Sequence, residues 1–149
     1  MASIRHRVGI YAPQERVYEA VATREGLASW WTRKVEGETT PGGTVRFFFG
    51  APEPRVVVEV VEADAPRRVV WRCVDSAEEW VGTTMTFDLR PGAEGETVLV
   101  FSQDGWREPV EFMHHCSTKW GYLLLGLKSG LEGGAATPYP DDMKVSSWG

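Results

Sequence analysis

The chain has 149 residues, of which 42% are hydrophobic and 25% charged, and its formal net charge is −5. This apolar content excludes an intrinsically disordered chain, and the length fits one domain that buries about 68–70% of the surface exposed by the unfolded chain. A net negative charge argues against a nucleic-acid partner, because such proteins neutralise phosphates with Lys and Arg. No apolar run approaches the ~20 residues of a membrane-spanning helix, so we expect no membrane insertion.

The start of the chain predicts one strand and two short helices. Residues 4–11 alternate apolar and charged side chains, which is typical of a strand. The residues before it lack the apolar region of a signal peptide. Pro13 then suits the first turn of a helix over residues 13–22. Thr23 is a plausible N-cap for a second helix that ends at Trp30 and Trp31. With only two cysteines and no leader, we expect a cytoplasmic, reduced protein.

After the Pro-Gly-Gly turn at residues 41–43, the hydrophobic period changes to two. Alternating apolar and polar side chains, separated by Pro- and Gly-containing turns, predict strands over residues 44–49, 56–63, 67–74, 81–89 and 97–103. Successive strands with short turns and one apolar face indicate an antiparallel meander. The sequence therefore predicts six strands in all.

The last periodic element is a helix over residues 109–132, with one broad apolar stripe and Gly133–Gly134 at its end. At 1.5 Å per residue such a helix is ~35 Å long, enough to cross a whole sheet. We therefore expect an α+β domain over residues 1–134. In it a curved six-stranded antiparallel sheet wraps around the long helix, with two short helices between strands 1 and 2. Residues 135–149 form an extended C-terminal tail.

The inward faces of the strands and the helix stripe predict a binding site for a small molecule. Seven Trp in so short a chain suit an apolar pocket, with Thr83 and Gln103 to orient a polar end of a ligand. The alternative is that these side chains fill the interior at native packing density. The expected lining residues are Trp30, Trp31, Phe47, Phe49, Trp71, Thr83, Met85, Phe87, Phe101, Gln103, Cys116, Trp120 and Leu123.

Other chemistry has weaker support. A metal site at His114, His115 and Cys116 is disfavoured, since consecutive helix residues point ~100° apart and cannot close on one ion. The same divergence weakens a Cys116–His115 nucleophilic pair. Cys73 could approach Cys116 as a redox pair, although a reduced, packed pair is the simpler interpretation. The inward faces hold no carboxylate, so His115 is the one candidate for acid–base catalysis near the long helix. We assign no catalytic residue, no metal and no cofactor.

Five segments carry a resemblance to a known family. They are residues 10–21 (IYAPQERVYEAV), 27–31 (LASWW), 41–43 (PGG), 66–71 (PRRVVW) and 120–123 (WGYL). Together they resemble the SRPBCC (START-like, or Bet v-like) superfamily, and within it the branch related to the activator of the ninety-kilodalton heat-shock chaperone's ATPase. The resemblance implies the helix-grip fold and a cavity that holds apolar molecules in many relatives. It implies no shared catalytic constellation.

These observations favour a domain that binds a small apolar or amphipathic molecule between sheet and helix. One alternative is a cofactor-free cyclase or hydratase acting on a polyketide-like or aromatic substrate. The other is a protein resembling the chaperone activator, with a contact surface around residues 50–54 or the aromatic tail. The edge strands or the tail could also form a homodimer.

Overall fold

The computed structural model describes all residues, 1–149, and contains seven strands and three helices. Residues 2–10 form the first strand, and the long C-terminal helix spans 21 residues. In chain order the elements are β1 (Ala2–Ile10), α1 (Gln14–Ala22), α2 (Arg24–Ala28), β2 (Lys34–Gly37), β3 (Thr44–Phe48), β4 (Val56–Asp64), β5 (Arg68–Asp75), β6 (Thr84–Pro91), β7 (Thr97–Trp106) and α3 (Glu111–Leu131).

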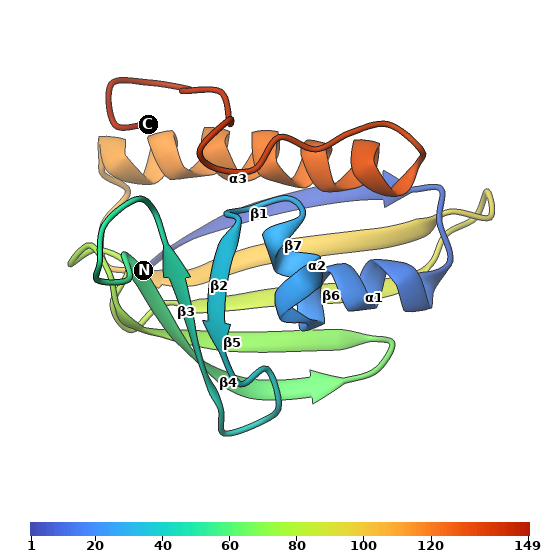
Figure 1. Cartoon of the computed structure of the whole chain (residues 1–149), viewed down its shortest axis with the longest axis horizontal. Coiled ribbons are helices and arrows are strands. Elements are labelled where there is room, and N and C mark those ends of the chain that lie inside the picture. Colours follow the sequence, from blue (N-terminus) through green and yellow to red (C-terminus); the bar gives the residue numbers. More distant parts are fainter.

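One antiparallel sheet holds all seven strands in the order β1-β7-β6-β5-β4-β3-β2, and it curves beneath α3 (Figure 1). The α+β class and the long helix against a curved sheet are as expected, but the expected number of six strands is wrong. The missed strand is β2, which pairs with β3 from Lys34 opposite Phe48 to Gly37 opposite Val45. Its four residues are too few and too polar to show a period of two, so pairing with β3 defines it.

The two short helices are also present, but α2 ends at Ala28 and not at Trp30 and Trp31 as expected. The junction between the two helices explains the local sequence. The hydroxyl of Thr23 caps α2 by accepting a hydrogen bond of 3.0 Å from the N–H of Gly26. Any Cβ at Gly26 would lie 2.2 Å from the carbonyl oxygen of Glu19, so only glycine lets α2 approach α1 this closely. The indole N–H of Trp30, just after α2, donates a 2.8 Å hydrogen bond to the carbonyl of Ala20 in α1, and this bond holds the two helices together.

Strand β6 begins later than the alternation predicts. The expected strand starts at residue 81, but residues 78–82 form a turn and Val81 is 43% exposed. Gly82 adopts φ +89°, a left-handed conformation that breaks the extended chain before Thr84. Thr83 nevertheless remains fully buried, because the turn directs it into the interior.

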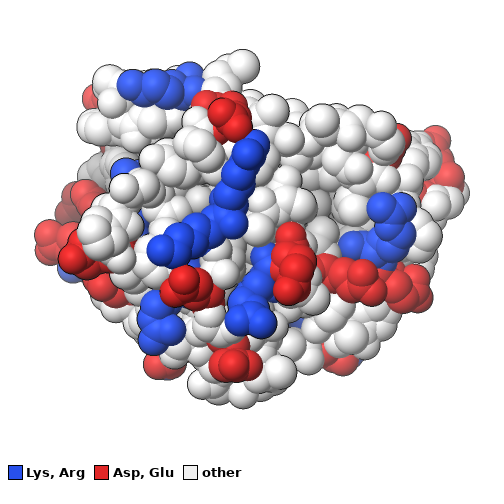
Figure 2. Space-filling view, viewed as in Figure 1, with Lys and Arg blue, Asp and Glu red and all other residues white.

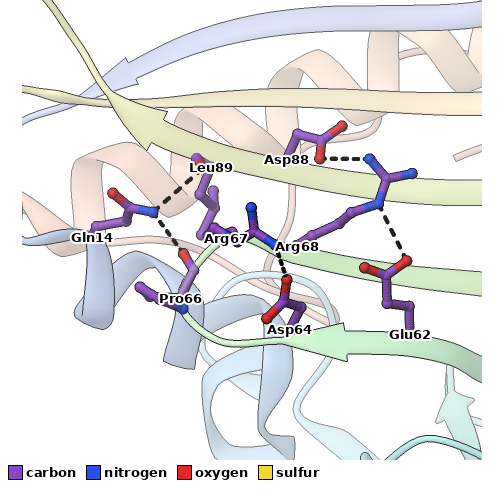
Figure 3. Close-up of polar contacts among 8 residues, drawn as sticks. All are labelled: Gln14, Glu62, Asp64, Pro66, Arg67, Arg68, Asp88 and Leu89. Carbon is purple, nitrogen blue, oxygen red and sulfur yellow. Dashed lines mark hydrogen bonds and ion pairs between the residues drawn. The ribbon is translucent and has the colours of Figure 1, made fainter.

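The face of the sheet away from α3 carries paired charges. Arg68 lies between Glu62, at 3.5 Å, and Asp88, at 2.9 Å, on the neighbouring strands (Figure 3). At the same end, the side-chain amide of Gln14 donates to the carbonyls of Pro66 and Leu89, so α1 is tied to β6 and to the turn before β5. On the face that carries β2 and α1, acidic and basic side chains are interspersed (Figure 2).

The C-terminal tail does not stand off from the domain. It turns back after α3 and runs along that helix, and its end lies beside the first turns of the helix (Figure 1). The ring of Trp148 meets Phe112 and His115 of α3, with centroids 5.8 and 5.7 Å apart. None of the helices has the length and apolar character needed to cross a membrane.

Candidate functional site

The candidate site is the interior between the concave face of the sheet and α3. The residues predicted to line it come from the turn after α2, the sheet and the bend after β3, the turn before β6, and α3. The structure brings them together in the interior. All are buried except Phe49, which is half-buried at the rim. The buried ones are Trp30, Trp31, Phe47, Trp71, Thr83, Met85, Phe87, Phe101, Gln103, Cys116, Trp120 and Leu123.

Trp31 is the centre of the aromatic cluster. Its ring lies 4.3 Å from that of Phe47 and 5.0 Å from that of Trp120, measured between centroids. It also stacks on Trp30 and on Trp71, at 6.1 and 6.3 Å. Unlike the indole of Trp30, that of Trp31 makes no hydrogen bond, so stacking alone holds it in place.

A second row of rings continues across the centre of the sheet to α3. Trp71 meets Phe87 at 4.9 Å, Phe87 meets Phe101 at 5.1 Å, and Phe101 meets Trp120 at 4.4 Å. These separations are those of directly contacting aromatic pairs. In this conformation the side chains expected to line a cavity pack against one another.

The buried polar groups form a connected set. The indole N–H of Trp120 donates to the side-chain oxygen of Gln103 over 2.9 Å. The amide nitrogen of Gln103 donates to the hydroxyl of Thr83 over 3.0 Å, and this hydroxyl donates to the carbonyl of Trp80 over 2.7 Å. The Gln103 amide thereby uses one of its two N–H groups, and the second makes no hydrogen bond to the protein.

Trp80 belongs to this interior but escaped sequence analysis, because it lies in the loop between β5 and β6, where no alternation identifies it. Its ring stacks on Trp120 at 5.9 Å, and its N–H donates to the sulfur of Cys116 over 3.3 Å. Burial raises the pKa of Cys116 to about 12 and that of Cys73 to about 11. Both cysteines are free.

The histidines lie outside the aromatic interior. His115 is on the flank of α3, where its Nδ1 is 2.6 Å from the hydroxyl of Ser146 in the tail. Burial, and secondarily the charge of Lys119, lower the pKa of His115. His6 is 3.3 Å from the hydroxyl of Ser117, and His114 is exposed. No group of three His, Cys, Asp or Glu side chains is arranged to hold a metal ion.

Two surface hollows lie elsewhere. One, of about 250 Å³, is near the start of α3 and is lined in part by Trp106, whose buried indole N–H has no partner. The other, of about 530 Å³, lies between residues 11–14 and 95–97. Neither is lined by any residue predicted for the site, so the aromatic interior remains the candidate.

Comparison with known proteins assigns the chain to a family. The family described as "Activator of Hsp90 ATPase homolog 1-like protein" matches residues 11–132. The solution structure of the Aha1 dimer from Colwellia psychrerythraea is 36% identical, with a TM-score of 0.81, and the match covers 90% of this chain and 98% of that chain. No curated protein gives a significant match.

More distant structures share the fold. The protein SSP2350 from Staphylococcus saprophyticus is 18% identical, with a TM-score of 0.75 over 91% of this chain and 95% of that one. CalU16 from Micromonospora echinospora is 19% identical, with a TM-score of 0.72 over 93% and 77% of the two chains. The resemblance found in the sequence is therefore confirmed over most of the chain.

Proposed function

We propose that this chain, which belongs to the family of activator of Hsp90 ATPase homolog 1-like proteins, binds a small apolar or amphipathic molecule between its sheet and α3. The observation that carries the proposal is the continuous aromatic surface around Trp31, which contacts both the sheet and the helix. Proteins of this fold commonly bind hydrophobic ligands, and an aromatic surface of this kind offers large, rigid contact area to an apolar molecule.

Because rings occupy the interior, a ligand must displace at least one of them. Trp31 is the side chain best placed to move. It lies in the turn after α2, its indole makes no hydrogen bond, and Phe49 beside it is already half-buried. Trp30 and Trp120, in contrast, are tethered by indole hydrogen bonds of 2.8 and 2.9 Å. Rotation of Trp31 opens space against Phe47, Trp71 and Trp120 without breaking a hydrogen bond.

The hydrogen-bonded residues Trp120, Gln103 and Thr83 give the same site a place for one acceptor atom of a ligand. The free N–H of the Gln103 amide can donate to a carbonyl or ether oxygen of a ligand, while its other groups keep Trp120 and Thr83 in position. An apolar body with one oxygen therefore fits better than a charged molecule, because the core supplies no cation or carboxylate to pair with a charge.

Native mass spectrometry of the freshly purified chain, followed by solvent extraction of the denatured sample, tests the proposal. We expect a bound mass in one-to-one ratio that is lost on denaturation and recovered in the organic extract. Wild type and Trp31→Ala are compared, with Val61→Ala as the control because Val61 on β4 lies on the surface, away from the tail. An empty wild type that also fails to take up N-phenyl-1-naphthylamine, an uncharged fluorescent probe, contradicts the proposal.

A second candidate function is a protein contact. The family's description and the dimeric relative from Colwellia psychrerythraea favour it. We propose that the chain forms a homodimer, tested by light scattering during size-exclusion chromatography. A pull-down with the ninety-kilodalton heat-shock chaperone tests whether the chain also contacts that chaperone.

A cyclase or hydratase role has less support, since the titratable side chains of the core are two cysteines whose pKa values burial raises to about 11 and about 12.

A further inference from the structure

The tail crosses the candidate site on its way along α3. After Gly133 and Gly134 the chain reverses direction and passes between α3 and the end of the sheet that carries β2 and β3 (Figure 1). There Pro138 is buried. The tail therefore passes over the part of the interior where Trp31 and Phe49 come nearest to the surface.

Tyr139 is the tail residue that covers Trp31 and Phe49. Its N–H donates to the carbonyl of Trp31 over 2.9 Å, and its carbonyl accepts from the N–H of Arg33 over 3.2 Å. Its ring lies 5.3 Å from that of Phe49, and its hydroxyl would be 2.5 Å from any Cβ at Gly50. Main-chain pairing on one side and ring contact on the other place the tail directly against Trp31.

Two ion pairs anchor the segment that follows. Asp142 is 2.6 Å from the ammonium group of Lys119 on α3, and both side chains are less than one-fifth exposed. The same ammonium donates to the carbonyls of Met143 and Gly149 over 2.6 and 2.9 Å. The second pair, between Asp141 and Arg33, is also 2.6 Å long but mostly exposed.

We propose that residues 137–149 form a lid that closes the ligand site and must leave the surface of Trp31 before a ligand enters. This inference rests on the proposed function. The lid is attached by two main-chain hydrogen bonds and by side-chain contacts to Arg33, His115, Lys119 and Tyr122, and it belongs to none of the seven paired strands. A segment attached in this way opens far more often than the sheet unfolds. Opening exposes Trp31, whose indole makes no hydrogen bond, unlike those of Trp30 and Trp120.

The lid sets the rate of ligand entry, because the observed association rate scales with the fraction of molecules in the open state. Stopped-flow mixing of the full chain with N-phenyl-1-naphthylamine, followed by energy transfer from Trp to the probe, measures this rate. Asp142→Lys places a second ammonium beside Lys119 and should raise the association rate about tenfold. Arg72→Asp breaks an exposed ion pair with Glu59 on the opposite face. This pair is comparable in exposure to Arg33–Asp141, so the variant is the matched control for Arg33→Asp and should leave the rate unchanged.

A charge exchange shows whether the lid contact itself is responsible. Arg33→Asp alone should accelerate probe entry, and adding Asp141→Arg should return the rate to within about twofold of wild type. General loss of stability would not be reversed in this way. Equal rates in wild type, Asp142→Lys and Arg33→Asp, with the probe bound in all of them, overturn the lid while leaving the ligand site intact.

Absence of probe binding in every variant would contradict the proposed function, and hydrogen exchange then tests the lid separately. The amide groups of Arg33 and Tyr139 both donate across the lid contact. Their exchange should accelerate together in Asp142→Lys, while the amides of β6 and β7 keep their protection. Unchanged exchange at Arg33 and Tyr139 overturns the lid as well.

Discussion

The indole N–H of Trp120 on α3 donates a 2.9 Å hydrogen bond to the side-chain oxygen of Gln103 on β7, across the interior of the protein. Gln103 is fully buried and Trp120 is 2% exposed, so water does not compete for this bond. The bond fixes the rotation of α3 relative to the sheet and directs the Trp120 ring onto Phe101 and Trp31. One polar contact thereby positions the helix side of the aromatic surface.

Replacing Gln103 tests the energetic role of this contact. Gln103→Leu leaves the Trp120 N–H buried without an acceptor, which should lower the free energy of unfolding by about 1–3 kcal/mol in urea denaturation. In Gln103→Leu/Trp120→Phe no unpaired N–H remains, so the loss should be smaller than the sum of the two single losses. Strictly additive losses would show that the hydrogen bond does not couple the two residues.

Truncating the central rings tests whether they line the ligand site. Phe87→Ala and Trp71→Ala should each lower stability by about 3–5 kcal/mol and also change the dissociation rate of N-phenyl-1-naphthylamine. Val70→Ala is the matched control, because Val70 is a buried neighbour of Trp71 on the opposite face of β5. It should lower stability without changing probe retention. Unchanged retention in all three variants would remove both rings from the site.

The two cysteines should be unreactive in the folded protein. Their pKa values of about 11 for Cys73 and about 12 for Cys116 leave almost no thiolate at pH 8, and both side chains are buried. We expect no mass increase after iodoacetamide treatment of the native chain, and two additions after treatment in urea. Rapid native labelling of Cys116 alone would contradict its burial beneath Trp80.

The contact between His115 and the tail should weaken in acid. Burial and Lys119 lower the pKa of His115 below its ordinary value of 6.5, so the folded state favours the neutral ring. Its contribution to stability is complete above pH 6.5 and is lost as pH falls toward the lower pKa of the folded state. Urea midpoints of wild type should therefore fall more steeply below pH 6.5 than those of His115→Gln. Parallel pH profiles would contradict this role.

The alternating strands and the striped helix made much of the fold predictable. Side chains such as Phe47, Phe87 and Phe101 were assigned to the inward face from the period of two alone, and all are fully buried. Strand β2 was missed because its four residues carry no apolar alternation, and only the register with β3 defines it. Trp80 was missed because a loop residue has no periodic neighbours.

The state of the site depended on contacts that the sequence does not display. Whether the rings leave a cavity or fill it follows from side-chain rotamers and centroid separations, not from composition. The hydrogen bonds of Gln103 depend on strand register and on the turn that buries Thr83. The position of Tyr139 over Trp31 joins segments more than a hundred residues apart, and no local pattern marks it.

The most direct test of the account is a titration of ¹⁵N-labelled protein with N-phenyl-1-naphthylamine, observed through the indole N–H resonances. Single Trp→Phe variants assign the seven signals. The account predicts saturable, one-to-one shifts of the Trp31, Trp71 and Trp120 signals. Shifts confined to Trp148, or no saturable shift of the three interior signals, would contradict a ligand site between the sheet and α3.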